Sequence, residues 1–307
     1  MTAIRAYAAA KLNLYLHVLG RREDGYHLLD SLVAFASAHD LVEVESTPYF
    51  SLQLHGPHSL PLLMEDTESN LVTKAVFRLA EALGRKPHVT VKLTKNLPLA
   101  SGIGGGSADA AATLRALCAL WDVPLDHPAV TELAAKLGAD VPVCVGSRTS
   151  YFAGTGTELS PAPDLPEDCW VVLVNPGVSM PTPAVFGARE GAFSEPARLT
   201  TSFTDVRELA ALLKDGRRND LTAPAVRLSP VITQVLAALD STAGCLLSRM
   251  SGSGATCFGL YVDFDHAVAA AELIGGIRPG WWVQPAALLN DLSGLELLEG
   301  VTLLDWP

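Results

Sequence analysis

The chain has 307 residues, a length that suits either two domains or one large domain. Its composition is 49% hydrophobic and 18% charged, which favours a sizeable folded core over disorder. The net charge of −11 argues against a general nucleic-acid or membrane-surface binder, because either would need a basic face. An anionic small-molecule substrate stays compatible, since it needs only a local positive pocket.

The cysteines and the N-terminus indicate a cytoplasmic protein. No C-x-x-C pair occurs, so neither a zinc site nor a disulfide framework is predicted, and we expect reduced, mostly buried thiols. The five are Cys118, Cys144, Cys169, Cys245 and Cys257. Lys11 and Asn13 interrupt the apolar stretch near the start, so no signal peptide is expected. No run of about 18 uncharged apolar residues predicts a membrane span.

The first half of the chain alternates strand-like and helix-like runs. Strands are predicted at residues 12–18, 41–45 and 88–94, the last with Val89, Val91 and Leu93 at a period of two. Helices are predicted at residues 70–84, 107–121 and 129–137, and short strands at 141–145 and 149–154.

The pattern restarts after residues 160–168, whose three prolines and acidic residues indicate an exposed connector. Strands are then predicted at 170–174, 255–262 and 281–287, and helices near 204–214, 230–239 and 265–274. Strands mixed with helices in both halves predict two α+β domains, with boundaries at 1–162 and 163–307.

The most informative segment is PLASGIGGGSADAAATLRAL, residues 98–117. Gly102, Gly104, Gly105 and Gly106 stand between a predicted strand and a helix for which Ser107 is the expected N-cap. A glycine loop that enters a helix N-terminus presents free N–H groups to a phosphate. The segment is neither a Walker A motif nor a G-x-G-x-x-G motif. The alternative is a tight turn used for close packing.

Several separated segments together resemble one family. The glycine loop resembles the phosphate-binding motif of the GHMP kinases, the superfamily of galactokinase, homoserine kinase and mevalonate kinase. Four further segments resemble the branch that acts on a cytidine diphosphate-linked methylerythritol: residues 6–32, 136–159, 175–186 and 248–261.

The resemblance implies an α+β, two-domain fold. Its N-terminal ATP-binding domain is like ribosomal protein S5 domain 2, and its C-terminal substrate domain is ferredoxin-like. It implies transfer of the γ-phosphoryl group of ATP, with Mg²⁺, to the 2-hydroxyl of the methylerythritol unit, in non-mevalonate isoprenoid precursor synthesis. The expected partner is this small molecule, with no nucleic acid or membrane, in a monomer or weak homodimer. The alternatives are another GHMP small-alcohol kinase or a non-catalytic nucleotide-binding protein.

By the same resemblance, Lys11 and Asp140 are the expected catalytic residues. A carboxylate can orient the attacking hydroxyl or accept its proton, and a nearby ammonium can offset the phosphoryl charge. From the residues alone, Asp140 is also consistent with a turn or a helix cap, and Lys11 is also consistent with the solvent-facing side of a strand.

The remaining expected residues contact the two substrates. Tyr26 and Phe186 are predicted as the walls of a cytosine pocket, and His27 as a partner of the polar edge of the base. The substrate set is Asn13, Tyr26, His27, Asp140, Thr182, Pro183 and Phe186. The ATP set is Asn70, Lys95, Pro98, Leu99, Ala100, Ser101, Gly102, Ile103, Gly104, Gly105, Gly106 and Ser107. Lys95 alternatively is a solvated turn lysine, and Ser107 alternatively reaches Mg²⁺ or only caps the helix. No protein ligand of the metal is identified, so Mg²⁺ is expected to be held mainly by ATP and water.

Overall fold

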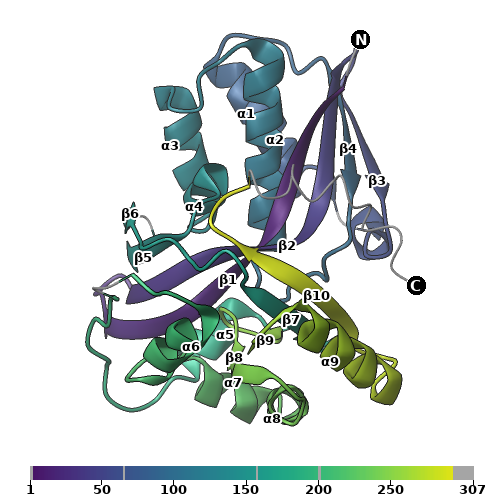
Figure 1. The fold of residues 1–307 in the computed structure, drawn as a ribbon. Coiled ribbons are helices and arrows are strands. Elements are labelled where there is room, and N and C mark those ends of the chain that lie inside the picture. Colours follow the sequence, from purple (N-terminus) through teal and green to yellow (C-terminus); the bar gives the residue numbers. More distant parts are fainter. Residues whose placement is uncertain (1–2, 65, 157, 200–201, 293–307) are drawn as a thin grey trace. The chain divides into compact units, whose positions relative to one another are not determined.

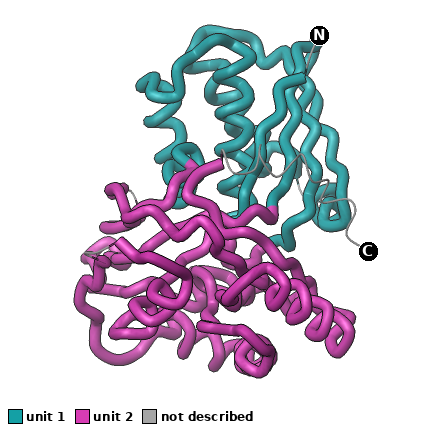
Figure 2. The backbone as a smooth tube through the Cα atoms, in the orientation of Figure 1, with its two compact units in different colours: residues 1–10, 39–99, 104–146 teal, residues 11–38, 100–103, 147–307 magenta. Residues whose placement is uncertain are grey.

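The chain folds into two compact units in a computed structural model that describes residues 3–64, 66–156, 158–199 and 202–292. Unit 1 comprises residues 1–10, 39–99 and 104–146, and unit 2 comprises residues 11–38, 100–103 and 147–307 (Figure 2). Each unit mixes strands and helices, as predicted. Residues 11–38 and 147–162, which the sequence assigned to the first domain, lie in unit 2.

Unit 1 is a sheet covered by helices. Strands β3 (Ser51–His55), β4 (Val89–Thr94) and the second part of β2 (His27–Ser46) are adjacent in that order, and β1 (Ile4–Arg21) pairs with β2. β4 is antiparallel to β2, with Val91 opposite Val44, and parallel to β3. A 3-10 helix, η1 (Leu60–Met64), follows β3.

Four helices lie on one side of these strands (Figure 1). They are α1 (Leu71–Ala82), α2 (Gly105–Trp121), α3 (Pro128–Leu137) and α4 (Val141–Gly146). α1 buries Val72, Ala75, Val76 and Leu79, the spacing of one helix face, and it packs against α2 and α3.

The segment 141–145 is a helix, so the predicted strand there is wrong. Its alternating valines suggested a period of two, but Pro142 is the second residue of α4. Proline fits the first turn of a helix, where its missing N–H costs no hydrogen bond. The turn closes with the Cys144 N–H donating to the Asp140 carbonyl at 3.2 Å.

Unit 2 contains a second antiparallel sheet in the order β10, β7, β9, β8. The bounds are β7 (Trp170–Asn175), β8 (Cys245–Met250), β9 (Cys257–Tyr261) and β10 (Trp282–Leu289). β10 continues onto β2 through Leu288 opposite Ala36. β2 also pairs with β5 (Ser150–Gly154), which pairs with β6 (Glu158–Pro161).

The helices of unit 2 bury an apolar core against this sheet. They are α5 (Thr182–Gly187), α6 (Val206–Lys214), α7 (Thr222–Leu228), α8 (Val231–Asp240) and α9 (Phe264–Ile277). Ile232 and Val235 of α8, Ala267 of α9 and Val172 of β7 all belong to one buried cluster. The proline-rich segment 160–168 lies inside this unit, where Leu165 is buried and bonded to Asn290 at both its N–H and its carbonyl.

All five cysteines are free, and four of them are buried, as expected for reduced thiols. No helix in the described part of the chain combines the length and the apolar character needed to span a membrane.

Candidate active site

The glycine loop is held in unit 2 through its backbone carbonyls. Three consecutive carbonyls accept hydrogen bonds from other segments of that unit. The bonds run from Thr256 N to Ser101 O at 3.0 Å, Ser251 Oγ to Gly102 O at 3.1 Å, and Lys11 N to Ile103 O at 2.9 Å. These three hydrogen bonds hold the loop in place through its carbonyl oxygens.

Gly102 meets the second glycine turn, residues 252–254, at backbone contact. A Cβ on Gly102 would lie 2.6 Å from the Gly254 carbonyl oxygen, and one on Gly252 would lie 2.6 Å from the Gly102 carbonyl oxygen. Gly102, Gly252 and Gly254 also have positive φ angles of 78°, 53° and 85°. Only glycine satisfies both the space and the backbone conformation at these positions.

Asn219 stabilises the second glycine turn by hydrogen bonds to its backbone. Its amide nitrogen donates to the carbonyls of Met250 at 2.7 Å and Gly252 at 2.8 Å, and its amide oxygen accepts from Leu221 N at 2.9 Å. Thr182 of α5 reaches the same turn, since its hydroxyl lies 2.9 Å from that of Ser253. The predicted residue Thr182 is therefore tied to this turn, and Asn219 is a supporting residue that the sequence did not reveal.

Helix α2 begins at Gly105 behind Gly104, which has φ 67° and ψ 19° and provides no side-chain cap. The expectation that Ser107 is the N-cap is wrong, because the glycines themselves enter the helix and Ser107 is its third residue. The first amides of a helix have no partner within the helix. In α2 the first two of these amides belong to Gly105 and Gly106, which have no side chains, at the positive end of the helix dipole, and this suits a phosphate.

Lys95 is buried in a cluster of charges in unit 1. Its Nζ forms ion pairs with Asp40 and, at 2.7 Å, with Asp109, and its side chain is 1% exposed. The other carboxylate oxygen of Asp40 accepts from the N–H groups of Asn96 at 2.6 Å and Leu97 at 2.8 Å. Asp40 therefore fixes the backbone where β4 enters the loop, and a solvated turn lysine, one of the two alternatives for Lys95, is wrong.

This cluster lies directly beside the start of α2, because a Cβ on Gly105 would be 3.6 Å from the Lys95 Nζ. Burial, aided by Asp40 and opposed by Lys95, raises the pKa of Asp109 to about 7. Burial disfavours the charge on Lys95, but Asp109 and Asp40 outweigh it and raise the pKa of Lys95. Asp109 is thus part of a buried ion network near the start of α2. A phosphate contact from Lys95 stays a prediction.

Lys11 and Asn13 lie on one face of β1 and are buried, with 4% and 1% of their surface exposed. The Lys11 Nζ donates to Asn13 Oδ1 at 3.3 Å and lies 5.4 Å from the centroid of the Phe152 ring. Asn13 Nδ2 donates to Ser31 Oγ at 2.8 Å. The surface reading of Lys11 is therefore wrong, and Asn13 orients its head group.

Asp140 lies in unit 1, in the turn between α3 and α4. Its turn is closed by Val141 N donating to Gly138 O at 3.1 Å. A Cβ on Gly138 would be 3.9 Å from the hydroxyl of Ser107, so the first turn of α2 and the Asp140 turn are neighbours in this unit. Lys11 belongs to unit 2, and its joint action with Asp140 stays a prediction.

The predicted nucleotide pocket contains a stacked pair in unit 2. The rings of His27 and Phe186 have centroids 4.9 Å apart and an interplanar angle of 27°. This is direct stacking, so one face of Phe186 is already covered by His27. Tyr26 is 66% exposed and available to a base. Burial, with Arg21 and Arg189, lowers the pKa of His27, which favours a neutral imidazole.

Asn70 forms the N-cap of α1, where its Oδ1 accepts from Val72 N at 2.9 Å. Its amide nitrogen is the group that we expect to face adenosine, and that contact stays a prediction.

Two family models match these units of the chain. The N terminal domain of GHMP kinases matches residues 70–148, which include the glycine loop, and the GHMP kinases C terminal model matches residues 198–274. The fold and the glycine loop thus define the class, and the predicted α+β, two-domain GHMP kinase fold is confirmed.

Close relatives carry one name. The chain is 50% identical over 290 residues to "4-diphosphocytidyl-2-C-methyl-D-erythritol kinase" of Paramagnetospirillum magneticum, covering 94% of this chain and 100% of that protein. It is 52% identical to the protein of the same name from Cereibacter sphaeroides, covering 93% and 99%. The chain belongs to the 4-diphosphocytidyl-2-C-methyl-D-erythritol kinase family.

Solved structures agree with this assignment. A crystal structure of 4-(cytidine 5'-diphospho)-2C-methyl-D-erythritol kinase has a TM-score of 0.76 at 34% identity and covers 92% of this chain and 99% of that chain. A homoserine kinase from Cytophaga hutchinsonii has a TM-score of 0.70 at 18% identity, covering 95% and 96%, and shows the shared fold alone.

Because Gly102 touches the second glycine turn, one methyl group added at residue 102 should strongly reduce activity or stability. Gly102→Ala should lower kcat/KM at least about tenfold, or the free energy of unfolding by about 2–4 kcal/mol, because backbone atoms must move apart. Gly276→Ala is the matched control, since a Cβ there meets nothing within 4 Å. It should be neutral or stabilising by up to about 1 kcal/mol. Urea denaturation and steady-state kinetics measure both, and equal effects would contradict the packing argument.

The buried Asp109 predicts a pH-dependent stability. Because its pKa is raised on folding, the folded state binds this proton more tightly, and that stability is lost as the pH rises through about 7. Asp109→Asn removes the loss. The free energy of unfolding of the variant minus that of wild type should therefore become more positive as the pH rises from about 5 to about 8. Exposed Asp126→Asn should show no such trend, and a pH-independent difference for Asp109→Asn would contradict the raised pKa of Asp109.

Proposed function

We propose that the chain transfers the γ-phosphoryl group of ATP to the 2-hydroxyl of 4-diphosphocytidyl-2-C-methyl-D-erythritol. The observation that carries this proposal is about 50% identity, over nearly the full length of both chains, to relatives named for that kinase activity. The glycine loop and the bare start of α2 supply a fitting phosphate site.

The residues divide the work by their chemistry. Asp140 orients the attacking hydroxyl and takes up its proton, and Lys11 offsets charge on the transferring group. Asn13 holds the Lys11 head group through its amide oxygen. Phosphoryl transfer depends mainly on positioning and charge stabilisation, which matches a site built from rigid loops.

We expect Mg²⁺ to bind at this site together with ATP. When bound, it neutralises phosphate charge, and it prefers phosphate oxygens and water as ligands. Among the residues that the structure describes, no group of three or more His, Cys, Asp or Glu side chains gathers into a metal site. The hydroxyl of Ser107, on the first turn of α2, is the side chain that we expect nearest to the phosphates.

The activity test is ADP release by the purified protein with Mg-ATP and one acceptor at a time. We expect release with 4-diphosphocytidyl-2-C-methyl-D-erythritol and none with homoserine, mevalonate or galactose. Asp140→Asn should lower kcat by about 10²–10⁴-fold while ATP binding persists. Asp126→Asn is the matched control on the same unit. Turnover of another acceptor would favour a different GHMP small-alcohol kinase, and ATP binding without any turnover would favour a non-catalytic protein.

Substitution of Tyr26 tests whether its ring binds the cytosine base of the acceptor. Tyr26→Ala should raise KM for the cytidyl substrate by the equivalent of about 1–3 kcal/mol, because the ring stacks on the base, with little change in KM for ATP. Tyr26→Phe should retain most affinity, since the ring remains. Tyr49→Ala removes another exposed tyrosine, in unit 1, and should change neither constant. Equal rises for both substrates in Tyr26→Ala would limit the ring to a structural role.

A further inference from the structure

A buried chain of hydrogen bonds starts at the Lys11 ammonium and crosses from β1 to β2 within unit 2. Lys11 Nζ donates to Asn13 Oδ1 at 3.3 Å, and Asn13 Nδ2 donates to Ser31 Oγ at 2.8 Å. The Ser31 hydroxyl in turn donates to the Tyr15 carbonyl oxygen. Ser31 is 0% exposed, so water does not compete for these bonds at its end of the chain.

The two ends of this chain allow one arrangement of its protons. An ammonium can only donate, and a backbone carbonyl can only accept. The single hydroxyl proton of Ser31 goes to the Tyr15 carbonyl, so toward Asn13 this hydroxyl is an acceptor. The NH2 group of the amide matches that acceptor, which leaves Oδ1 of Asn13 for Lys11. The Ser31 hydroxyl therefore supports the orientation of the amide in which its oxygen faces the ammonium.

Loss of the Ser31 hydroxyl would leave the Asn13 Nδ2 group buried without this acceptor. A buried donor without a partner costs free energy, so the amide is expected to turn toward another acceptor. Any such turn withdraws Oδ1 from Lys11, because the oxygen and the nitrogen belong to the same planar group. Ser31 thus controls a contact of the lysine that it does not itself touch.

The backbone of Asn13 is fixed independently of Ser31. Asn13 N donates to Ser251 Oγ at 3.2 Å, and Ser251 Oγ donates to the Gly102 carbonyl oxygen at 3.1 Å. The same hydroxyl therefore joins β1 to the glycine loop. The amide of Asn13 is the part of the residue that depends on Ser31.

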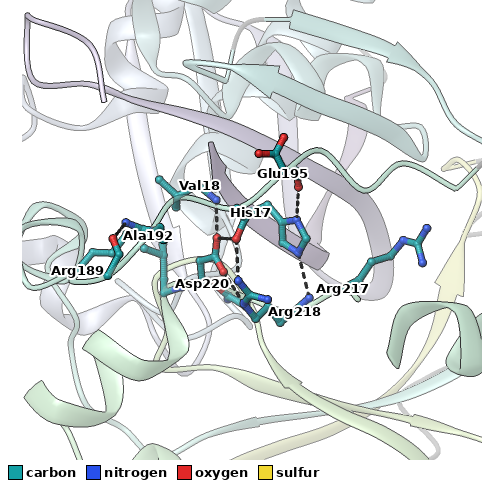
Figure 3. Close-up of polar contacts among 12 residues, drawn as sticks. His17, Val18, Arg189, Ala192, Glu195, Arg217, Arg218 and Asp220 are labelled. Atoms are coloured by element: carbon teal, nitrogen blue, oxygen red, sulfur yellow. Dashed lines mark hydrogen bonds and ion pairs between the residues drawn. The ribbon is translucent and has the colours of Figure 1, made fainter. Parts of the chain in front are cut away.

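The later part of β1 is also held by other residues of unit 2 (Figure 3). Val18 N donates to Asp220 Oδ2 at 2.8 Å, and Nδ1 of His17 lies 2.9 Å from the Glu195 carbonyl oxygen. A change at the Ser31 hydroxyl should therefore loosen the amide and leave the strand in place.

Phe152 of β5 lies directly opposite Ser31 of β2 in the sheet. Lys11 Nζ lies 5.4 Å from the centroid of the Phe152 ring. The face of an aromatic ring attracts a cation but offers it no single directed acceptor. Asn13 Oδ1 supplies the direction that the ring does not, so the orientation of the amide matters for where the ammonium points.

We propose that Ser31 is a positioning residue for phosphoryl transfer, which acts by holding the Asn13 amide with its oxygen toward Lys11. This inference rests on the proposed function, in which Lys11 offsets charge on the transferring group. It adds that β2 contributes to the reaction through a buried hydroxyl, because the effect of a charge on the transition state depends on its exact position.

The kinetic test is Ser31→Ala. We expect kcat to fall about tenfold and KM for ATP to change by less than about twofold, because the amide orients a group that acts in the transition state. Ser37→Ala is the matched control, since Ser37 is another buried serine of β2 whose hydroxyl accepts from Ala287 N at 2.9 Å. It should keep kcat within about twofold of wild type. An unchanged kcat in Ser31→Ala, or an equal loss in Ser37→Ala, would overturn the proposal.

A double-mutant cycle tests whether Ser31 acts through Asn13. Asn13→Ala removes the amide, so Ser31→Ala added to it should lower kcat by less than about twofold further. Ser31→Thr retains the hydroxyl and should keep kcat within about threefold of wild type. A tenfold loss from Ser31→Ala in both backgrounds, or a loss in Ser31→Thr as large as in Ser31→Ala, would contradict action through the amide.

Nuclear magnetic resonance of ¹⁵N-labelled asparagine side chains separates this inference from the proposed function. The Asn13 NH2 signals are identified by their absence from Asn13→Ala. In Ser31→Ala these protons should exchange with solvent at least about tenfold faster, because they lose a buried acceptor, while Ser37→Ala leaves their exchange unchanged.

Faster exchange in Ser31→Ala, in a protein that does not turn over the cytidyl substrate, would mean that the proposed function is wrong and the Ser31 contact is right. Unchanged exchange in Ser31→Ala would show that Ser31 does not hold the amide.

Discussion

The contact between two glycine turns is the constraint on which the proposed phosphate site depends. Gly102 and the turn 252–254 meet backbone to backbone, with no room for a Cβ on either side. The contact fixes the loop through its carbonyls and leaves the amides at the start of α2 for a ligand. Affinity for an anion then comes from main-chain groups that are already oriented, so little order has to be created on binding.

Charge supports this backbone arrangement from within unit 1. Asp40 holds the exit of β4 by two N–H groups, and Lys95 compensates Asp40 and Asp109 beside Gly105. An ammonium buried between two carboxylates is costly to remove, because each charge would be left without a partner. A loop rich in glycine is flexible in isolation, and these fixed charges make it rigid where the chain enters and leaves it.

Local patterns in the sequence predicted what local physics determines. The period of β4, the apolar stripe of α1 and the glycine loop before α2 were all recognisable, because each is encoded within a few residues. The prediction at 141–145 failed because the alternation of valines outweighed the helix-starting preference of Pro142. Two partners of the site, Asp40 and Asn219, carried no local signal. They act across large sequence separations, which a single chain read in order does not reveal.

The course of β1 and β2 has a consequence for any attempt to divide this protein. Each strand begins in one compact unit and ends in the other, since residues 1–10 and 39–46 belong to unit 1 and residues 11–38 to unit 2. A fragment that starts at residue 147 would lack β2, one of the two strands with which β5 and β10 each pair. Truncation or gene splitting at that breakpoint would thus leave unpaired sheet edges on both products.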